Sequence, residues 1–131
     1  MQVYMYDIGR DRWTEVASMK EKRYTPSCLT IDGTSTESKV LVCGGAGRTD
    51  CEIWRNGQWT NGPRVPSSEY GSRMIKPSLN SQFAAFVVGG EESSGITNKI
   101  YGIKKDLTSV TTLGTFQQAR RWHVAFQTKC Q

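Results

Sequence analysis

The chain has 131 residues, 37% of them hydrophobic, and carries a formal net charge of +5. This length suits one small domain, and the longest apolar run, residues 83–88, falls far short of the ~20 residues that a membrane-spanning helix needs. The Lys and Arg residues are scattered among acidic ones, and no helix is predicted that could present them to a nucleic-acid groove. The sequence therefore disfavours both a membrane and a nucleic-acid partner.

Short strand patterns separated by turn signals run along the whole chain. In chain order they predict strands at residues 3–6, 13–16, 24–31, 40–43, 51–55, 58–60, 72–75, 83–88, 98–103, 110–113 and 122–127. Asn56-Gly57 predicts a two-residue hairpin turn, since both residues tolerate positive φ. Residues 40–43 are apolar at every position, so both faces of that strand are expected to be buried. Residues 116–121 allow one helical turn at most, and we predict an all-β fold.

One feature of the chain occurs twice, an apolar run that ends in two glycines. Its first glycines, Gly44 and Gly89, stand 45 positions apart. Trp54 and Trp59 follow the first pair, and Tyr101 follows the second. A glycine pair lets the backbone turn sharply and approach an aromatic ring closely, which a Cβ atom would prevent. A period of this length is typical of repeat architectures.

The repeated unit resembles the kelch repeat, which forms one four-stranded blade of a β-propeller. The resemblance covers essentially the whole chain and is carried by the glycine pairs and the aromatic residues near them: Tyr6, Trp13, Gly44, Gly45, Trp54, Trp59, Gly89, Gly90 and Tyr101. It departs from the family pattern at Val110, where the family prefers tryptophan. The kelch pattern and the large apolar surface of a tryptophan ring both favour a core position. Trp13, Trp54 and Trp59 are therefore interpreted as core aromatics rather than ligand-stacking residues.

The resemblance implies a kelch-type β-propeller fragment with two full four-stranded blades and partial blades at both ends. The full blades would span residues 24–63 and 70–113, after the second half of a blade at residues 1–23 and before the start of a further blade at residues 114–131. Closed propellers have typically 4–8 blades, so this ring would be incomplete. We expect a fragment of a longer protein rather than an assembly of copies.

In this arrangement Cys43 ends the second strand of a blade and Cys51 begins the third. Antiparallel neighbours at these positions are expected to lie close enough for a disulfide, and the alternative is two buried reduced thiols. A bridge would indicate an extracellular or secretory setting. Without a bridge the cytoplasm is slightly favoured, because residues 1–7 do not form a secretory signal and no Asn-x-Ser/Thr acceptor is present.

Catalytic and cofactor signals are weak, and we expect neither an enzyme nor a cofactor or metal. Residues 44–47 begin like a dinucleotide-binding loop, but Asp50 stands where a third glycine is needed and a strand follows instead of a helix. The single histidine, His123, is interpreted as structural rather than as a catalytic base. The kelch resemblance leaves two alternatives, a fragment of a secreted kelch protein or of a propeller-based copper oxidase, whose metal would need several converging His and Tyr ligands.

The predicted function is that of a non-enzymatic protein-interaction module. In the kelch family the loops between strands two and three and between blades share one face. Arginines and tyrosines in such loops suit an acidic peptide motif, because guanidinium groups bind carboxylates bidentately. The candidate partner-binding residues are Arg23, Tyr24, Arg48, Tyr70, Arg73, Arg120 and Arg121. By resemblance, the partners would be substrates of cullin ubiquitin ligases or actin.

Overall fold

The computed structural model describes residues 2–31, 39–78 and 80–126. Their regular structure is almost entirely antiparallel β, apart from one 3-10 turn, η1 (Ile8–Arg10). The predicted all-β class is therefore confirmed. The loop expected at residues 32–38, and Cys130, lie outside the described residues.

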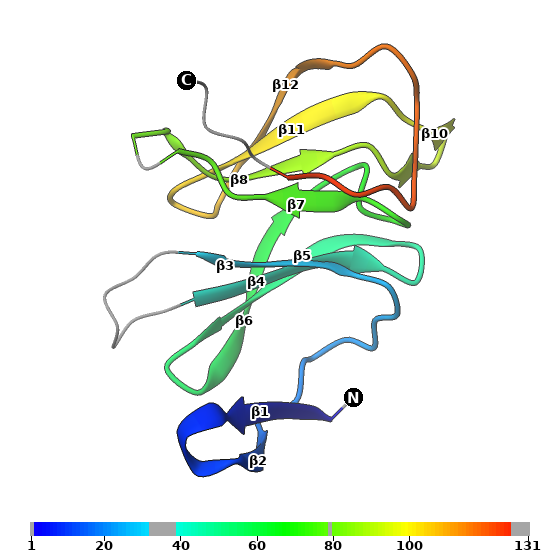
Figure 1. Ribbon diagram of the computed structural model, residues 1–131. Helices are drawn as coiled ribbons and strands as arrows, with labels where there is room; N and C mark the ends of the chain where they lie inside the picture. Colours follow the sequence, from blue (N-terminus) through cyan, green and yellow to red (C-terminus); the bar gives the residue numbers. More distant parts are fainter. Residues whose placement is uncertain (1, 32–38, 79, 127–131) are drawn as a thin grey trace.

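Four consecutive strands form the first sheet, in the spatial order β3-β4-β5-β6 (Figure 1). They are β3 (Ser27–Ile31), β4 (Lys39–Gly45), β5 (Arg48–Arg55) and β6 (Gln58–Arg64). The predicted burial of both faces of residues 40–43 is confirmed for Leu41, Val42 and Cys43, which have at most 6% of their surface exposed, whereas Val40 is half-buried. The turn between β5 and β6 has φ values of 50° at Asn56 and 81° at Gly57, the pair of left-handed residues that a tight hairpin turn requires.

The second sheet has the same meander topology, in the order β12-β11-β8-β7 (Figure 1). Its strands are β7 (Arg73–Ile75), β8 (Phe83–Val88), β11 (Lys99–Lys104) and β12 (Val110–Thr115). No strand was predicted between residues 88 and 98, the segment that connects β8 and β11. It instead forms a small hairpin of β9 (Glu91–Glu92) and β10 (Gly95–Ile96).

A separate two-stranded sheet, β1 (Val3–Asp7) with β2 (Arg12–Val16), precedes the two larger ones. Tyr6 pairs with Trp13 across it, and their ring centroids are 4.9 Å apart. Trp13 is nevertheless 66% exposed, so its interpretation as a core aromatic is wrong. The hairpin has only two strands, and its Trp13 ring is not covered by another layer. Trp54 and Trp59, which pair in the first sheet with centroids 5.3 Å apart, are half-buried.

The last predicted strand, residues 122–127, is not formed in its described part, residues 122–126. Trp122 has a φ of 57°, outside the range of extended backbone. Its N–H donates to the carbonyl of Gly71 at 2.9 Å, a bond between two connecting segments rather than within a sheet. These residues do alternate as a strand would. A strand also needs a neighbouring strand to pair with, and no strand of the described residues pairs with residues 122–126. Residues 116–121 form bends and no helical turn.

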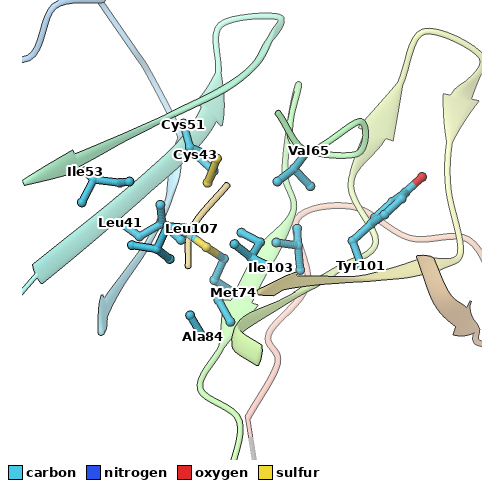
Figure 2. Packing of buried hydrophobic residues seen from close by; sticks show 12 residues of the cluster. Leu41, Cys43, Cys51, Ile53, Val65, Met74, Ala84, Tyr101, Ile103 and Leu107 are labelled. Carbon is cyan, nitrogen blue, oxygen red and sulfur yellow. A yellow bond between two sulfur atoms is a disulfide. The ribbon is translucent and has the colours of Figure 1, made fainter. Parts of the chain in front are cut away.

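One hydrophobic core joins the two four-stranded sheets (Figure 2). Leu41 and Ile53 enter it from the first sheet, Met74 and Ile103 enter it from the second, and Val65 enters it from the segment that connects them. Burial of such side chains stabilises the fold by roughly 25 cal/mol for each Å² of apolar surface removed from water. Because both sheets contribute to the same core, they hold each other in place.

The connections of the chain fall at two ends of this arrangement. The tight turns of the hairpins β1–β2 and β5–β6 lie at the left in Figure 1, whereas the β4–β5 turn, the β6–β7 connection and the β9–β10 hairpin lie at the right. We call the right-hand end the loop face. It is formed by residues 20–26, 46–48, 65–73, 91–97 and 116–123, so that it includes Arg73, the first residue of β7.

Candidate interaction face

Backbone hydrogen bonds fasten the loops of this face to one another. Gly45 N–H donates to the Ser68 carbonyl at 3.0 Å, and Gly90 N–H donates to the Arg120 carbonyl at 2.9 Å. Each glycine pair therefore holds the connection that follows its sheet. Gly44 shows why glycine is needed here, since a Cβ atom at this position would lie 1.7 Å from the Ser68 carbonyl oxygen. The loop face is thus a fixed surface built on two sheets.

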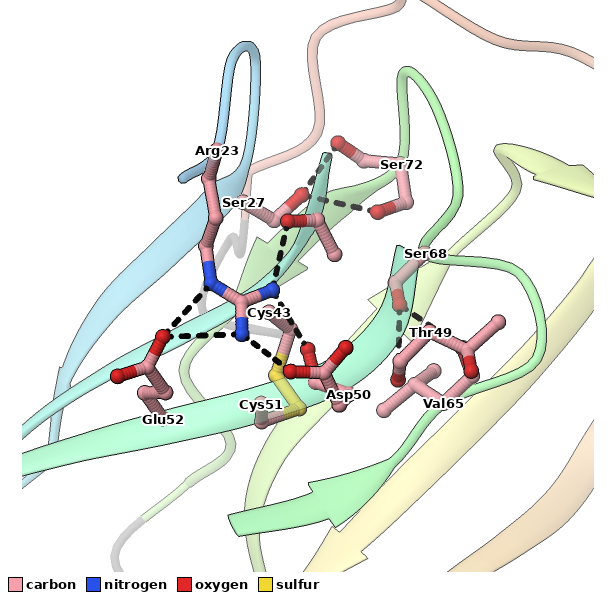
Figure 3. The surroundings of a disulfide bond; sticks show 11 residues. Arg23, Ser27, Cys43, Thr49, Asp50, Cys51, Glu52, Val65, Ser68 and Ser72 are labelled. Atoms are coloured by element: carbon pink, nitrogen blue, oxygen red, sulfur yellow. Dashed lines mark hydrogen bonds and ion pairs between the residues drawn. A yellow bond between two sulfur atoms is a disulfide. The ribbon is translucent and has the colours of Figure 1, made fainter. Parts of the chain in front are cut away.

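Beneath this face, Cys43 and Cys51 form a disulfide (Figure 3), which decides between the two alternatives that the sequence left open, a bridge or two buried reduced thiols. The two residues are directly opposite each other in β4 and β5, with their Cα atoms 4.0 Å apart. Both are buried. The bridge closes the β4–β5 hairpin immediately below the turn that reaches the loop face.

Arg23 lies at the centre of a buried polar network beside the disulfide (Figure 3). Its guanidinium donates to Glu52 Oε1 from Nε at 3.2 Å and from Nη2 at 3.1 Å, and to the Gly44 carbonyl at 2.9 Å. It also donates to the Asp50 carbonyl at 2.8 Å and to Asp50 Oδ2 at 2.5 Å. The Arg23 side chain has no exposed surface. All of its donors are used within the chain, which leaves it no access to a partner.

Glu52 is the acidic counterpart of Arg23 and was missed at the sequence level. In addition to Arg23 it accepts the backbone N–H groups of Lys20 at 2.8 Å and Glu21 at 3.2 Å. It is 1% exposed. A carboxylate between the apolar residues Cys51 and Ile53 of a predicted strand is the signal that could have identified it, because a buried charge requires a partner.

Arg48 is also paired within the chain, but at the surface. It contacts Glu21 Oε2 at 3.1 Å and Asp50 Oδ1 at 2.9 Å. Burial acts to raise the pKa of Asp50, but hydrogen bonds from Arg23 and Arg48 outweigh it and hold that pKa below its ordinary value. These side chains line part of an open polar pocket of about 570 Å³ with carboxylates and cations in nearly equal number. Arg48 is therefore largely neutralised by its own chain.

The second sheet repeats this pairing around β9. Arg121 forms an ion pair with Glu91, and Glu92 accepts from Lys99 at 3.0 Å and from the Tyr101 hydroxyl at 2.5 Å. Burial tends to raise the pKa of Glu92, but the bonds from Tyr101 and Lys99 hold it below its ordinary value. Burial and the bond to Glu92 raise the pKa of the Tyr101 hydroxyl.

Two of the candidate arginines have no such carboxylate. Arg73 Nη1 donates to the Ser72 carbonyl at 3.0 Å, and the Arg120 guanidinium lies over the Phe116 ring, 5.6 Å from its centroid. Among the described residues neither forms an ion pair. Both lie near His123, whose pKa they help to lower. Arg73 and Arg120 are therefore the cations of this candidate set whose charge is left uncompensated on the loop face.

Exposed aromatic side chains accompany these arginines. Tyr24 and Tyr70, from different loops, have hydroxyl groups 3.4 Å apart and ring centroids 6.0 Å apart. Tyr24 is 58% exposed, and Trp122, which was not predicted as a site residue, is 49% exposed. Trp122 and Arg73 line a shallow pocket of about 400 Å³ between the two sheets, together with Pro26, Cys28 and Met74 among others. The structure thus brings Tyr24 together with Tyr70, and it places Arg73 and Arg120 near the same histidine, His123.

No protein-family model matches the chain, and no curated protein is significantly similar to it. Residues 2–31, 39–78 and 80–126 contain no group of three His, Cys, Asp or Glu side chains placed to hold a metal ion. Within the same ranges there is no helix that is both long and apolar enough to cross a membrane.

Proposed function

We propose that this chain is part of a kelch-type β-propeller and acts as a non-enzymatic protein-interaction module. Two observations support the fold assignment. Both larger sheets are four-stranded meanders, and in each the second strand is followed by a glycine pair that holds the next connection. Tyr101 is buried on the third strand of its sheet, and Trp54 is half-buried on the third strand of the other, where the kelch pattern places an aromatic residue.

The partner would be a protein segment that presents acidic side chains to Arg73 and Arg120. The observation that carries this function is the division of the arginines on the loop face. Arg23, Arg48 and Arg121 are bound to carboxylates of the chain, whereas Arg73 and Arg120 have no carboxylate partner in the part of the chain that the structure describes. A carboxylate from a partner would gain charge-assisted hydrogen bonds there without displacing an internal one.

We also propose an extracellular or secretory-pathway setting. The Cys43–Cys51 disulfide supports it, because such bridges persist in oxidising compartments and are rare in the cytosol. This setting favours an extracellular acidic partner over the cytoplasmic partners, cullin ligase substrates or actin, that the kelch resemblance implies.

The experiment is a charge reversal of the two unpaired arginines, Arg73→Glu with Arg120→Glu. The probe is an array of synthetic ten-residue peptides in which paired glutamates scan every position, beside matched peptides with glutamine. At low ionic strength we expect the unaltered protein to bind a subset of the glutamate peptides. The double variant should bind them more than tenfold more weakly, since each charge-assisted hydrogen bond contributes about 1.5–3 kcal/mol.

The matched control is Arg10→Glu with Arg12→Glu, which makes the same charge change on the β1–β2 hairpin at the opposite end of the molecule. This control should retain peptide binding, apart from a weak salt-dependent loss. Equal binding by the double variant and the unaltered protein, or equal retention of glutamine and glutamate peptides, would contradict the proposed function. Circular dichroism of each variant confirms that the β structure is intact.

A further inference from the structure

The segment that carries Arg120 and Trp122 is fastened to the loop face by a few contacts. We call residues 120–123 the strap. Its backbone accepts from Gly90 N–H at 2.9 Å, donates from Arg120 N–H to the Thr97 carbonyl at 3.2 Å, and donates from Trp122 N–H to the Gly71 carbonyl at 2.9 Å. These contacts come from two connections, β6–β7 and β8–β11. The position of Arg120 and Trp122 on the loop face therefore depends on the strap keeping these contacts.

His123 anchors the strap through its half-buried ring. Both ring nitrogens, Nδ1 and Nε2, are buried and have no hydrogen-bond partner among the described residues. The ring packs against Phe116, with centroids 6.5 Å apart, and over Gly89. A Cβ atom at Gly89 would lie 2.9 Å from the His123 ring and 2.5 Å from the Arg120 carbonyl, so the seat requires glycine.

The charges around this ring all oppose its protonation. Arg73 faces it from β7 and Arg120 faces it from the strap itself, while Phe116 and the Gly89 end of β8 present no titratable side chain. Burial, Arg73 and Arg120 together lower the pKa of His123 from its ordinary value of 6.5. An imidazolium in this seat would have two buried N–H donors without acceptors and two arginines beside it.

The strap is also held in an unfavourable backbone conformation. Trp122, which precedes the histidine, has a φ of 57°, in the left-handed region that non-glycine residues rarely adopt. Such strain persists only where surrounding contacts impose it. Loss of the His123 anchor would therefore free the strap to leave its seat.

We propose that His123 is a proton-operated latch, which seats the strap when neutral and releases it when protonated. Its effect on binding rests on the function proposed above, because release removes Trp122 and displaces Arg120 from the loop face. The partner would then be bound near neutral pH and released in mildly acidic conditions. The latch itself is a property of the free protein.

The pH window follows from the direction of the pKa shift. A released ring has the ordinary pKa of 6.5 and takes up a proton more readily than the seated one. The seated state is therefore fully favoured above pH 6.5. Below pH 6.5 the ratio of seated to released protein falls by up to about tenfold per pH unit, until the pH reaches the lower pKa of the seated ring.

The first measurement is an NMR titration of the His123 ring protons, which need no assignment because the chain has one histidine. We expect an apparent pKa below 6.5 in the free protein. The second is hydrogen exchange of the Gly90 and Trp122 amides at pH 7.5 and pH 5.5, corrected for intrinsic rates. Their protection should fall several-fold at the lower pH. The internal reference is the Gly45 amide, which donates to Ser68 in the equivalent place of the first sheet, where no histidine lies.

Two variants separate the latch from a general effect of acid. His123→Phe keeps a buried ring that cannot be protonated, so its Gly90 and Trp122 amides should be equally protected at both pH values. Gly89→Ala blocks the seat, so the same amides should be poorly protected at both. An apparent pKa of 6.5 or above would overturn the latch, and so would the same pH dependence in His123→Phe as in the unaltered protein. Neither measurement involves a partner, so both leave the function proposed above to its own peptide-binding test.

Discussion

Arg23 uses its guanidinium for five hydrogen bonds, to Glu52, Asp50 and the Gly44 carbonyl. From the sequence it was one of several arginines near a loop and was assigned to partner binding. The structure places it at the junction of the chain that enters β3, the end of β4 and the start of β5. Its charge is matched by the buried carboxylate of Glu52 and the partly buried one of Asp50. Arg23 therefore orders the loop face from below.

At this scale we predict that Arg23→Met destabilises the protein by about 3–5 kcal/mol, because it leaves the Glu52 charge buried without its counterion. Urea denaturation measures the loss. The double variant Arg23→Met with Glu52→Gln should recover part of it, since no charge then remains buried.

Arg48→Met is the matched control, because it makes the same substitution at a more exposed arginine that also pairs with Asp50. Its side chain is 34% exposed, so the expected loss is less than about 1 kcal/mol. Equal losses at positions 23 and 48 would show that Arg23 is not the buried centre of the network.

Among the elements, the β4–β5 hairpin does most to position the loop face. It carries the disulfide, the buried Glu52 and the glycine pair, whose Gly45 N–H donates to the Ser68 carbonyl in the connection to the second sheet. The equivalent β8–β11 pair has no disulfide and instead carries the inserted β9–β10 hairpin, in which Glu91 and Glu92 bind Arg121 and Lys99. This part of the chain is thus stabilised by a disulfide together with ion pairs in the first sheet, and by ion pairs in the second.

The double variant Cys43→Ala with Cys51→Ala is predicted to lose about 2–3 kcal/mol of stability, as expected when a bridge closing a short loop is removed. Thermal denaturation with and without reductant measures this. Cys28→Ala is the control, because Cys28 is an exposed free thiol and its removal should leave stability within about 0.5 kcal/mol. A melting temperature of the unaltered protein that does not respond to reductant would contradict a stabilising bridge.

At the scale of the whole molecule, the two larger sheets are one cooperative unit. They share a single hydrophobic cluster, and Ser27 on β3 donates its hydroxyl to the Ser72 carbonyl beside β7 at 2.6 Å. Neither sheet buries its apolar face alone. The loop face depends on this union, because Tyr24 and Tyr70 meet across the boundary between the sheets.

We therefore predict a single unfolding transition for the two larger sheets. Leu41→Ala in the first sheet and Ile103→Ala in the second should each cost about 2–5 kcal/mol, since both side chains are fully buried. Calorimetry should show both variants shifting the same transition. A variant that lowers one of two separate transitions would indicate sheets that unfold independently.

Local patterns in the sequence determined the strands. Apolar alternation, the Asn56-Gly57 turn and the glycine pairs act over a few residues, so ten of the eleven predicted strands are present and in meander order. The Cys43–Cys51 bridge was predictable for the same reason, since it joins neighbouring antiparallel strands. The kelch assignment, drawn from the same local pattern, stays a prediction.

Only the tertiary structure decided the outcomes that depend on distant residues. Trp13 and Arg23 differ little in the sequence from other tryptophans and arginines, yet one is exposed and the other has no exposed surface. Strand-like residues 122–126 form no strand, because pairing needs a neighbour that an alternating pattern cannot supply. Which arginines are neutralised, and that the ring nitrogens of His123 are buried without a hydrogen-bond partner in the described part of the chain, likewise follow from desolvation and from contacts between segments far apart in the chain.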